Sequence, residues 1–171
     1  MLYFGYGSNM LTARLRARVP SATPRSTGRL EGYRLRFHKR SQDGSGKCNI
    51  APADDGTVYG IVFDVDAAEL DALDEAEQRG RGYERCDVRV HGTSTSVEAF
   101  AYSAQPAYID DALLPYEWYH ALVLAGAREH ELPASYIAGL GSIRSYPDPN
   151  EARRRKYRAL LDDAGYPLLS S

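Results

Sequence analysis

The first apolar run of the chain is short and ends in a cluster of turn residues. Residues 2–5 (LYFG) predict a strand, and the segment YFGYGSNM (residues 3–10) then turns sharply through two glycines. Apolar side chains after this turn recur at helical spacing as far as residue 19. This pattern predicts a helix whose first turn is capped by Ser8 or Asn9.

Alternation of apolar and polar residues predicts strands in the next part of the chain. Residues 28–39 favour two strand pieces around the dipeptide Glu31-Gly32. Residues 41–56 are rich in Gly, Asp and Ser, which favours a loop with one short strand over residues 48–51.

The clearest strand signals lie in the middle of the chain. Residues 57–65 (TVYGIVFDV) are apolar and rich in β-branched side chains, which is typical of a central strand. Residues 83–92 and 96–104 alternate with period two on either side of a short polar turn. They predict a β-hairpin.

Helical patterns follow the central strand and fill the last third of the chain. Asp66 is the expected N-cap of one helix, with Glu69 three residues on as its capping-box partner. Residues 116–131 and 133–140 predict two more helices, and a loop then leads into a basic helix within residues 147–171.

These elements together predict a mixed α+β fold rather than a doubly wound parallel sheet. Short strands and a hairpin favour a small curled sheet or β-barrel of five to six strands, with flanking and C-terminal helices. No repeat or linker interrupts the 171 residues, so we expect a single domain over residues 1–171. Its core would span about residues 2–140 and its helical tail about residues 147–171.

The composition is that of an ordinary soluble globular protein. With 43% hydrophobic residues, 26% charged residues and a net charge of -2, neither nucleic acid nor an anionic membrane is expected as a partner. No signal peptide or spanning run of apolar residues is recognisable. Cys48 and Cys86 are read most simply as reduced thiols, which favours a cytoplasmic location. The basic helix predicts a solvated face, although it could instead cover the barrel or a partner subunit of a homodimer.

Three interpretations of the turn GYGSNM (residues 5–10) compete. A dinucleotide-binding fingerprint needs a third glycine where Met10 stands, and a nucleophile elbow around Ser8 needs a glycine at the same position. The third interpretation is a concave turn whose backbone N–H groups bind an anion or the oxyanion of a reacting carbonyl. A tight turn without any ligand is an equal alternative.

One carboxylate lies on the apolar face of the helix expected after residue 66. Leu70, Leu73 and Glu77 share one stripe at 3.6 residues per turn. Burial raises the pKa of a carboxyl group toward the range that suits proton transfer near neutrality. Glu77 is therefore a candidate acid–base residue. The alternatives are a solvated position beyond the last helical turn, or a salt bridge with Arg79 or Arg81.

Several segments, taken in order, resemble the γ-glutamylcyclotransferase family. They are YFGYGSNM (3–10), GKCNIAP (46–52), VYGIVFDV (58–65), LDEAE (73–77) followed by Gly82-Tyr83, AYS (101–103) and YHALVLAGAREHELPASY (119–136). The pair Ser8-Asn9 is similar to the general branch of this family, because the glutathione-specific branch usually carries leucine where Asn9 stands. Two features depart from the family: Gln78 stands where glycine is frequent, and the segment after about residue 145 has no obvious counterpart.

The resemblance implies a metal-independent enzyme that uses no cofactor. Such an enzyme would convert a γ-glutamyl amino acid or amide to 5-oxoproline and a free amine, by attack of the substrate's own α-amine on its γ-carbonyl. Glu77 would be the acid–base residue. The substrate pocket implied by the resemblance consists of Tyr3, Phe4, Gly5, Tyr6, Gly7, Ser8, Asn9, Tyr102 and Tyr119.

Other functions stay open at the level of the sequence. The same chemistry could act on a γ-glutamyl amine or on a γ-glutamyl-protected secondary metabolite. Ser8 could be the nucleophile of a serine hydrolase. The chain could also be a non-catalytic small-molecule-binding or interaction domain on the same scaffold. The four histidines lack the spacing of metal ligands.

Overall fold

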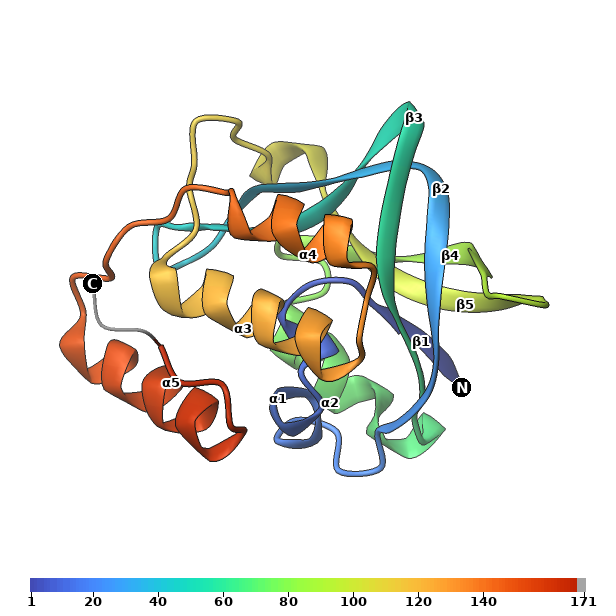
Figure 1. The fold of residues 1–171 in the computed structure, drawn as a ribbon, viewed down its shortest axis with the longest axis horizontal. Helices are drawn as coiled ribbons and strands as arrows, with labels where there is room; N and C mark the ends of the chain where they lie inside the picture. The colour runs from blue at the N-terminus through green and yellow to red at the C-terminus, as the bar shows by residue number, and fades with distance from the viewer. Residues whose placement is uncertain (169–171) are drawn as a thin grey trace.

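The computed structural model describes residues 1–168, and its strands close into a five-stranded barrel (Figure 1). The strands are β1 (Leu2–Gly5), β2 (Thr23–Arg40), β3 (Gly46–Asp64), β4 (Tyr83–His91) and β5 (Ser96–Ala104). Their order around the barrel is β1-β3-β2-β4-β5, and a parallel contact between β1 and β5 closes it. The predicted mixed α+β barrel is confirmed.

The helices lie mainly to one side of the barrel. They are η1 (Ser8–Met10), α1 (Thr12–Arg16), η2 (Ala67–Glu69), α2 (Leu70–Glu77), η3 (Pro106–Tyr108), α3 (Glu117–Glu129), α4 (Ala134–Gly141) and α5 (Glu151–Asp163). Figure 1 shows α3 in the middle of this group, with α4 and α5 beside it and with α1 and α2 near the end of β1. This arrangement places the loop after β1 between the barrel and α3.

β2 and β3 are longer than the sequence pattern predicts, because they form one extended antiparallel pair. β3 occupies most of the segment 41–56, so the strand expected over residues 48–51 is confirmed but the loop expected around it is wrong. The two strand pieces expected around Gly32 are one strand with an irregularity between Glu31 and Tyr33. A bulge lets a ladder continue through Gly- and Asp-rich stretches, which a local pattern reads as loop.

The helix expected from Ser8 or Asn9 to residue 19 is broken into η1 and α1. Gly7 occupies the N-cap position of η1, and no side chain caps it. The side chains of Ser8 and Asn9 instead contact Arg14 and Glu77, respectively. The capping prediction is therefore wrong, because these polar side chains have tertiary partners.

The start of α2 is tied to the turn before β2. The carboxylate of Asp66 accepts a hydrogen bond from the Ala68 amide at 2.9 Å, so Asp66 is a cap as predicted. Glu69 does not complete the capping box. It accepts hydrogen bonds from the amide and hydroxyl of Ser21, at 3.0 and 2.6 Å. This tertiary contact overrides the local box.

A close approach of α3 fixes the position of η1. Gly126 lies so near the chain that a Cβ built there would be 2.4 Å from the Leu11 amide nitrogen and 2.6 Å from the Met10 carbonyl carbon. Met10 and Leu11 are fully buried beneath this helix. At the end of α3, the Glu129 carboxylate accepts a hydrogen bond from the Thr12 amide at 2.9 Å. The loop after β1 is thus held between the barrel and α3.

The basic helix α5 packs against α3 of the same chain. The ring of Tyr157 stacks on that of Trp118 with a centroid separation of 3.9 Å. The Arg154 guanidinium donates a hydrogen bond to the Glu117 carboxylate at 2.7 Å. The segment after residue 147 is therefore part of the helical layer.

Candidate active site

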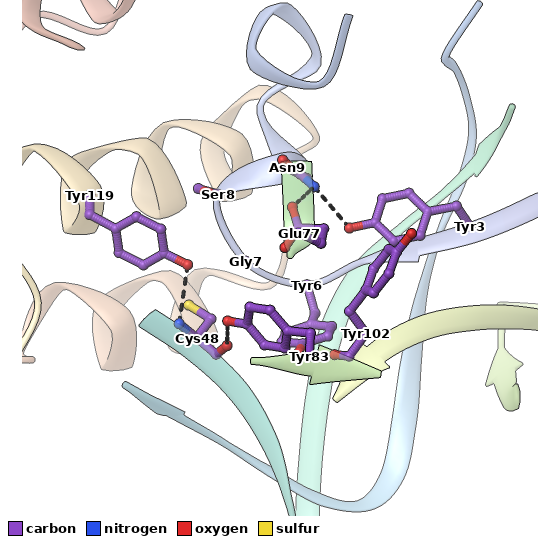
Figure 2. A pocket seen from close by; sticks show the side chains of 10 residues that line it. All are labelled: Tyr3, Tyr6, Gly7, Ser8, Asn9, Cys48, Glu77, Tyr83, Tyr102 and Tyr119. Carbon is purple, nitrogen blue, oxygen red and sulfur yellow. Dashed lines mark hydrogen bonds between the residues drawn. The ribbon is translucent and has the colours of Figure 1, made fainter. Parts of the chain in front are cut away.

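A small pocket lies where the chain leaves β1. Its empty volume is about 290 Å³. The lining residues are Tyr3, Tyr6, Gly7, Ser8, Asn9, Cys48, Glu77, Tyr83, Tyr102 and Tyr119. Figure 2 shows these residues converging from the loop after β1, from α2 and α3, and from the strands β1, β3, β4 and β5. Five of the thirteen tyrosines of the chain gather here, which gives the pocket an aromatic wall with polar tips.

Most of the predicted site residues meet in this pocket. Of the ten predicted positions, Phe4 and Gly5 are the two that do not line it. The side chain of Phe4 is fully buried and packs near the ring of Tyr6, with a centroid distance of 6.4 Å. Gly5 ends β1, where it pairs with Ile61. Both positions support the pocket wall rather than form its surface.

Glu77 lies at the end of α2 and faces the opening loop. It shares the helix face of Leu73, which is fully buried, and its own side chain is 15% exposed. Glu77 Oε1 accepts hydrogen bonds from Asn9 Nδ2 at 2.9 Å and from Arg18 at 2.8 Å (Figure 2 shows the first). Both contacts hold Oε1 of the carboxylate in a fixed position. The salt-bridge partner is Arg18, not Arg79, which pairs with Asp74.

Asn9 connects Glu77 to the tyrosine wall. Its Nδ2 also donates to the Tyr3 hydroxyl at 3.0 Å, and its Oδ1 accepts from Arg18 at 2.9 Å. The Asn9 side chain in η1 thus links β1, the turn after α1 and α2. This network fixes the direction in which the Glu77 carboxylate points.

The hydroxyl groups of three pocket tyrosines are held by hydrogen bonds within the protein. The Tyr102 hydroxyl donates to Asp74 at 2.6 Å, and the Tyr83 hydroxyl donates to the Cys48 carbonyl. The Tyr119 hydroxyl accepts from the Cys48 amide at 3.1 Å. Burial raises the pKa of Tyr83, Tyr102 and Tyr119. These phenols therefore stay protonated at neutral pH and are unsuited to act as bases.

Neither Ser8 nor Cys48 has the surroundings of a nucleophile. The Ser8 hydroxyl accepts a hydrogen bond from Arg14 at 3.0 Å, a group that cannot take its proton. Burial raises the pKa of the Cys48 thiol to about 12, so the thiolate is scarce at neutral pH. Glu77 is the one carboxylate among the pocket-lining residues. Glu77 is therefore the candidate for proton transfer among the residues that line the pocket.

Gly7 gives the pocket its open floor. A Cβ at this position would lie 3.0 Å from the Cys48 Cβ and 3.4 Å from the Tyr119 hydroxyl. Within residues 1–168, no carbonyl or side chain is hydrogen-bonded to the amides of Gly7 and Ser8. Two backbone donors are thus available at the place where the sequence suggested an oxyanion or anion cradle.

Three residues of this site were missed at the level of the sequence. Cys48 and Tyr83 line the pocket, and Arg18 pairs with Glu77. Cys48 and Tyr83 lie within segments that resemble the family, but neither was assigned a role. No local pattern relates Arg18 to Glu77, because 59 positions separate them.

The described residues, 1–168, contain no group of three or more His, Cys, Asp or Glu side chains placed to hold a metal ion. None of their helices is both long and apolar enough to cross a membrane.

Fold and pocket together define a small barrel protein with a carboxylate beside a glycine turn, and comparisons with known proteins place it. A model of the AIG2-like family matches residues 57–140. The chain is 32% identical over 167 residues to a γ-glutamylcyclotransferase of Bos taurus, a match that covers 94% of this chain and 86% of that protein. A human γ-glutamylcyclotransferase is 33% identical over 156 residues, with 88% and 80% coverage. The chain belongs to the γ-glutamylcyclotransferase family.

A solved structure supports the same relationship. The structure of a γ-glutamyl cyclotransferase superposes with a TM-score of 0.83 at 27% identity, covering 92% of this chain and 98% of the other. The match to the Bos taurus protein leaves only 6% of this chain uncovered, so it extends into the segment after residue 145. The expectation that this segment has no counterpart is therefore wrong.

Proposed function

We propose that this protein is a γ-glutamylcyclotransferase, which cyclises the γ-glutamyl group of its substrate to 5-oxoproline and releases the other amine. The main support for this proposal is the position of Glu77, a semi-buried carboxylate that accepts hydrogen bonds from Asn9 and Arg18. It lies in the same pocket as the backbone amides of Gly7 and Ser8. Membership of the family supports it.

The pocket provides what an intramolecular acyl transfer requires. The substrate supplies the nucleophile, so the absence of an activated Ser8 or Cys48 from the described pocket is compatible with the reaction. Folding the substrate so that its α-amine meets its γ-carbonyl can supply about 7–11 kcal/mol of the barrier. The aromatic wall formed by Tyr3, Tyr6 and Tyr102 suits this role, because each of its hydroxyls is fixed by a hydrogen bond within the protein.

Glu77 is the proposed acid–base residue. The α-ammonium group of the substrate carries three protons, and one remains on the lactam nitrogen of 5-oxoproline. Glu77 takes a proton from the attacking nitrogen and gives it to the leaving nitrogen as the γ-amide C–N bond breaks. The remaining proton leaves with the released amine or with water. Arg18 contacts Glu77 Oε1 at 2.8 Å and so helps to hold the carboxylate in place for these transfers.

The amides of Gly7 and Ser8 are the proposed oxyanion donors. Attack on the γ-carbonyl places negative charge on its oxygen, and preorganised N–H donors stabilise that charge more strongly than the neutral carbonyl. The absence of a side chain on Gly7 leaves room for the carbonyl between Cys48 and Tyr119. Removing one donor of this kind typically costs about 100- to 1,000-fold in kcat.

The identity of the product tests the proposal. The protein is incubated with γ-glutamyl dipeptides, glutathione and γ-glutamyl amines, and the products are separated by chromatography. We expect 5-oxoproline and free amine in equal amounts. Glutamate in place of 5-oxoproline would show hydrolysis and contradict the mechanism. No turnover of any member of the panel would instead support a binding domain on this scaffold.

A further inference from the structure

A basic groove continues outward from the pocket. It has an empty volume of about 690 Å³ and shares Ser8, Glu77, Tyr83 and Tyr119 with the pocket. Five cationic side chains line the groove against two carboxylates, those of Asp43 and Glu77; the cations are Arg14, Arg18, Lys39, Lys47 and Arg153. The wall of the inner pocket itself contains no Lys or Arg. Positive charge is therefore concentrated at the outer end of the site.

Three of the five cations already have carboxylate partners. Arg18 pairs with Glu77 at 2.8 Å and Lys47 pairs with Asp43 at 2.7 Å. Arg153 is paired through both oxygens of Asp148, a residue just outside the groove. These pairs leave little net charge for a ligand.

The other two cations, Lys39 and Arg14, have no carboxylate within ion-pair distance among residues 1–168. Lys39 is only 3% exposed, and its ammonium group donates no hydrogen bond to any of residues 1–168. Its Nζ lies 4.7 Å from the centre of the Tyr83 ring. Arg14 is 7% exposed and uses one nitrogen for Ser8. Burying a cation without a carboxylate partner is costly, which indicates that an anionic ligand would stabilise these two groups.

Burial lowers the pKa of both Lys39 and Arg14. A negatively charged ligand would offset this cost, since ionised partners form hydrogen bonds that are roughly twice as strong as neutral ones. The two cations come from different elements, β2 and α1. Cζ of Arg14 lies 5.0 Å from the centre of the Tyr157 ring, which belongs to α5. The groove is thus built from three parts of the chain.

We propose that Lys39 and Arg14 bind the leaving group of the substrate and select leaving amines that carry two carboxylates. This inference rests on the proposed function, which places the γ-glutamyl unit in the inner pocket and the leaving amine in the groove. A neutral amino acid brings one carboxylate to the groove and a simple amine brings none. An acidic amino acid brings two, which matches the two cations that lack partners.

A matched pair of substrates tests the charge requirement. γ-Glutamyl-glutamate and γ-glutamyl-glutamine have nearly the same shape and differ by one negative charge. We expect kcat/KM of the wild-type protein to be about tenfold or more higher for γ-glutamyl-glutamate at low salt, a ratio that falls as ionic strength rises. γ-Glutamyl ethylamide should be the poorest of the three substrates. Equal values for the matched pair would overturn the inference.

Variants then assign the effect to Lys39. In Lys39→Met the ratio for the matched pair should fall toward one, and Lys39→Arg should restore a large part of it. Arg89→Met is the control, because it removes one exposed positive charge of β4 outside both cavities and should leave the ratio unchanged. Thermal unfolding checks that each variant is folded. A ratio that is the same in Lys39→Met as in the wild type would contradict the assignment.

The outcomes separate this inference from the proposed function. If no member of the γ-glutamyl panel, these two dipeptides included, yields 5-oxoproline, both are overturned; if other members are cyclised but neither of these dipeptides is, only the leaving-group site is overturned. If both dipeptides are cyclised at the same rate, only the leaving-group site is overturned.

Discussion

Replacing Gly126 by alanine tests how the active-site loop is held in place. The new Cβ would lie 2.4 Å from the Leu11 amide nitrogen and 2.6 Å from atoms of Met10, which is closer than such atoms approach. Alanine favours a helix over glycine by about 1 kcal/mol. Overpacking against backbone costs about 1–3 kcal/mol, and here the obstructing atoms cannot rotate away. The cost should therefore lie in the upper part of this range, about 2–3 kcal/mol, which leaves a net loss of stability of about 1–2 kcal/mol after the gain in helix propensity.

This loss corresponds to a fall in Tm of roughly 2–8 °C for a chain of this size. Because η1 carries Ser8 and Asn9, its displacement from α3 should also lower kcat/KM for 5-oxoproline formation by tenfold or more. Thermal and urea unfolding measure the first effect, and a product assay measures the second.

Gly139 in α4 offers a matched control for this experiment. Within residues 1–168, and apart from its chain neighbours and the backbone of its own helix, no atom lies within 4 Å of a Cβ built at this exposed position. Gly139→Ala should therefore stabilise the protein by about 0.5–1 kcal/mol through helix propensity alone. If Gly126→Ala were as stable as Gly139→Ala, the close packing of α3 on the opening loop would be refuted.

Three further predictions concern the site and its surroundings. Asn9→Leu removes the 2.9 Å hydrogen bond to Glu77, and kcat should fall by about 10- to 100-fold while the protein stays folded; unchanged kcat would refute the role of Asn9. Gln78 ends α2 with φ 56 and ψ 46, a left-handed conformation that costs a residue with a side chain about 1 kcal/mol. Gln78→Gly should therefore raise Tm by roughly 2–4 °C, and a lower Tm would contradict this account. Burial lowers the pKa of Lys47 to about 8, so between pH 8 and about 10 the unfolded chain binds more protons at this residue than the folded protein does. Over that interval the unfolding free energy of the wild type should rise by up to about 2 kcal/mol relative to that of Lys47→Met. A difference between these two proteins that did not vary with pH would contradict the last prediction.

Local patterns in the sequence predicted the elements whose partners are near in sequence. The hairpin of β4 and β5, the helices α3 and α4, and the apolar face that carries Glu77 all follow from residues within one or two turns or strands. The pattern failed where distant contacts decide the conformation. β3 continues through a Gly- and Asp-rich stretch because β2 pairs with it, and Ser8 and Asn9 leave the helix cap because Arg14 and Glu77 bind them.

The site shows the same division between local and distant information. The segments that resemble the family identified eight of the ten pocket-lining residues, but not Cys48 or Tyr83. Neither Arg18 nor Lys39 could be assigned from the sequence, since each gains its significance from a residue far along the chain or from the lack of a partner. The glycine frequent in the family where Gln78 stands also has a physical reason only in the structure, namely the left-handed backbone at that position.

The most direct test of the central claim compares Glu77→Gln with the wild type in 5-oxoproline formation and in 5-oxoproline binding. Glutamine keeps the size of the side chain but cannot accept and return a proton. We predict that kcat falls by at least about 100-fold, while binding of 5-oxoproline, measured by calorimetry, changes only a few-fold. Turnover of Glu77→Gln within a few-fold of the wild type would contradict the assignment of Glu77 as the acid–base residue.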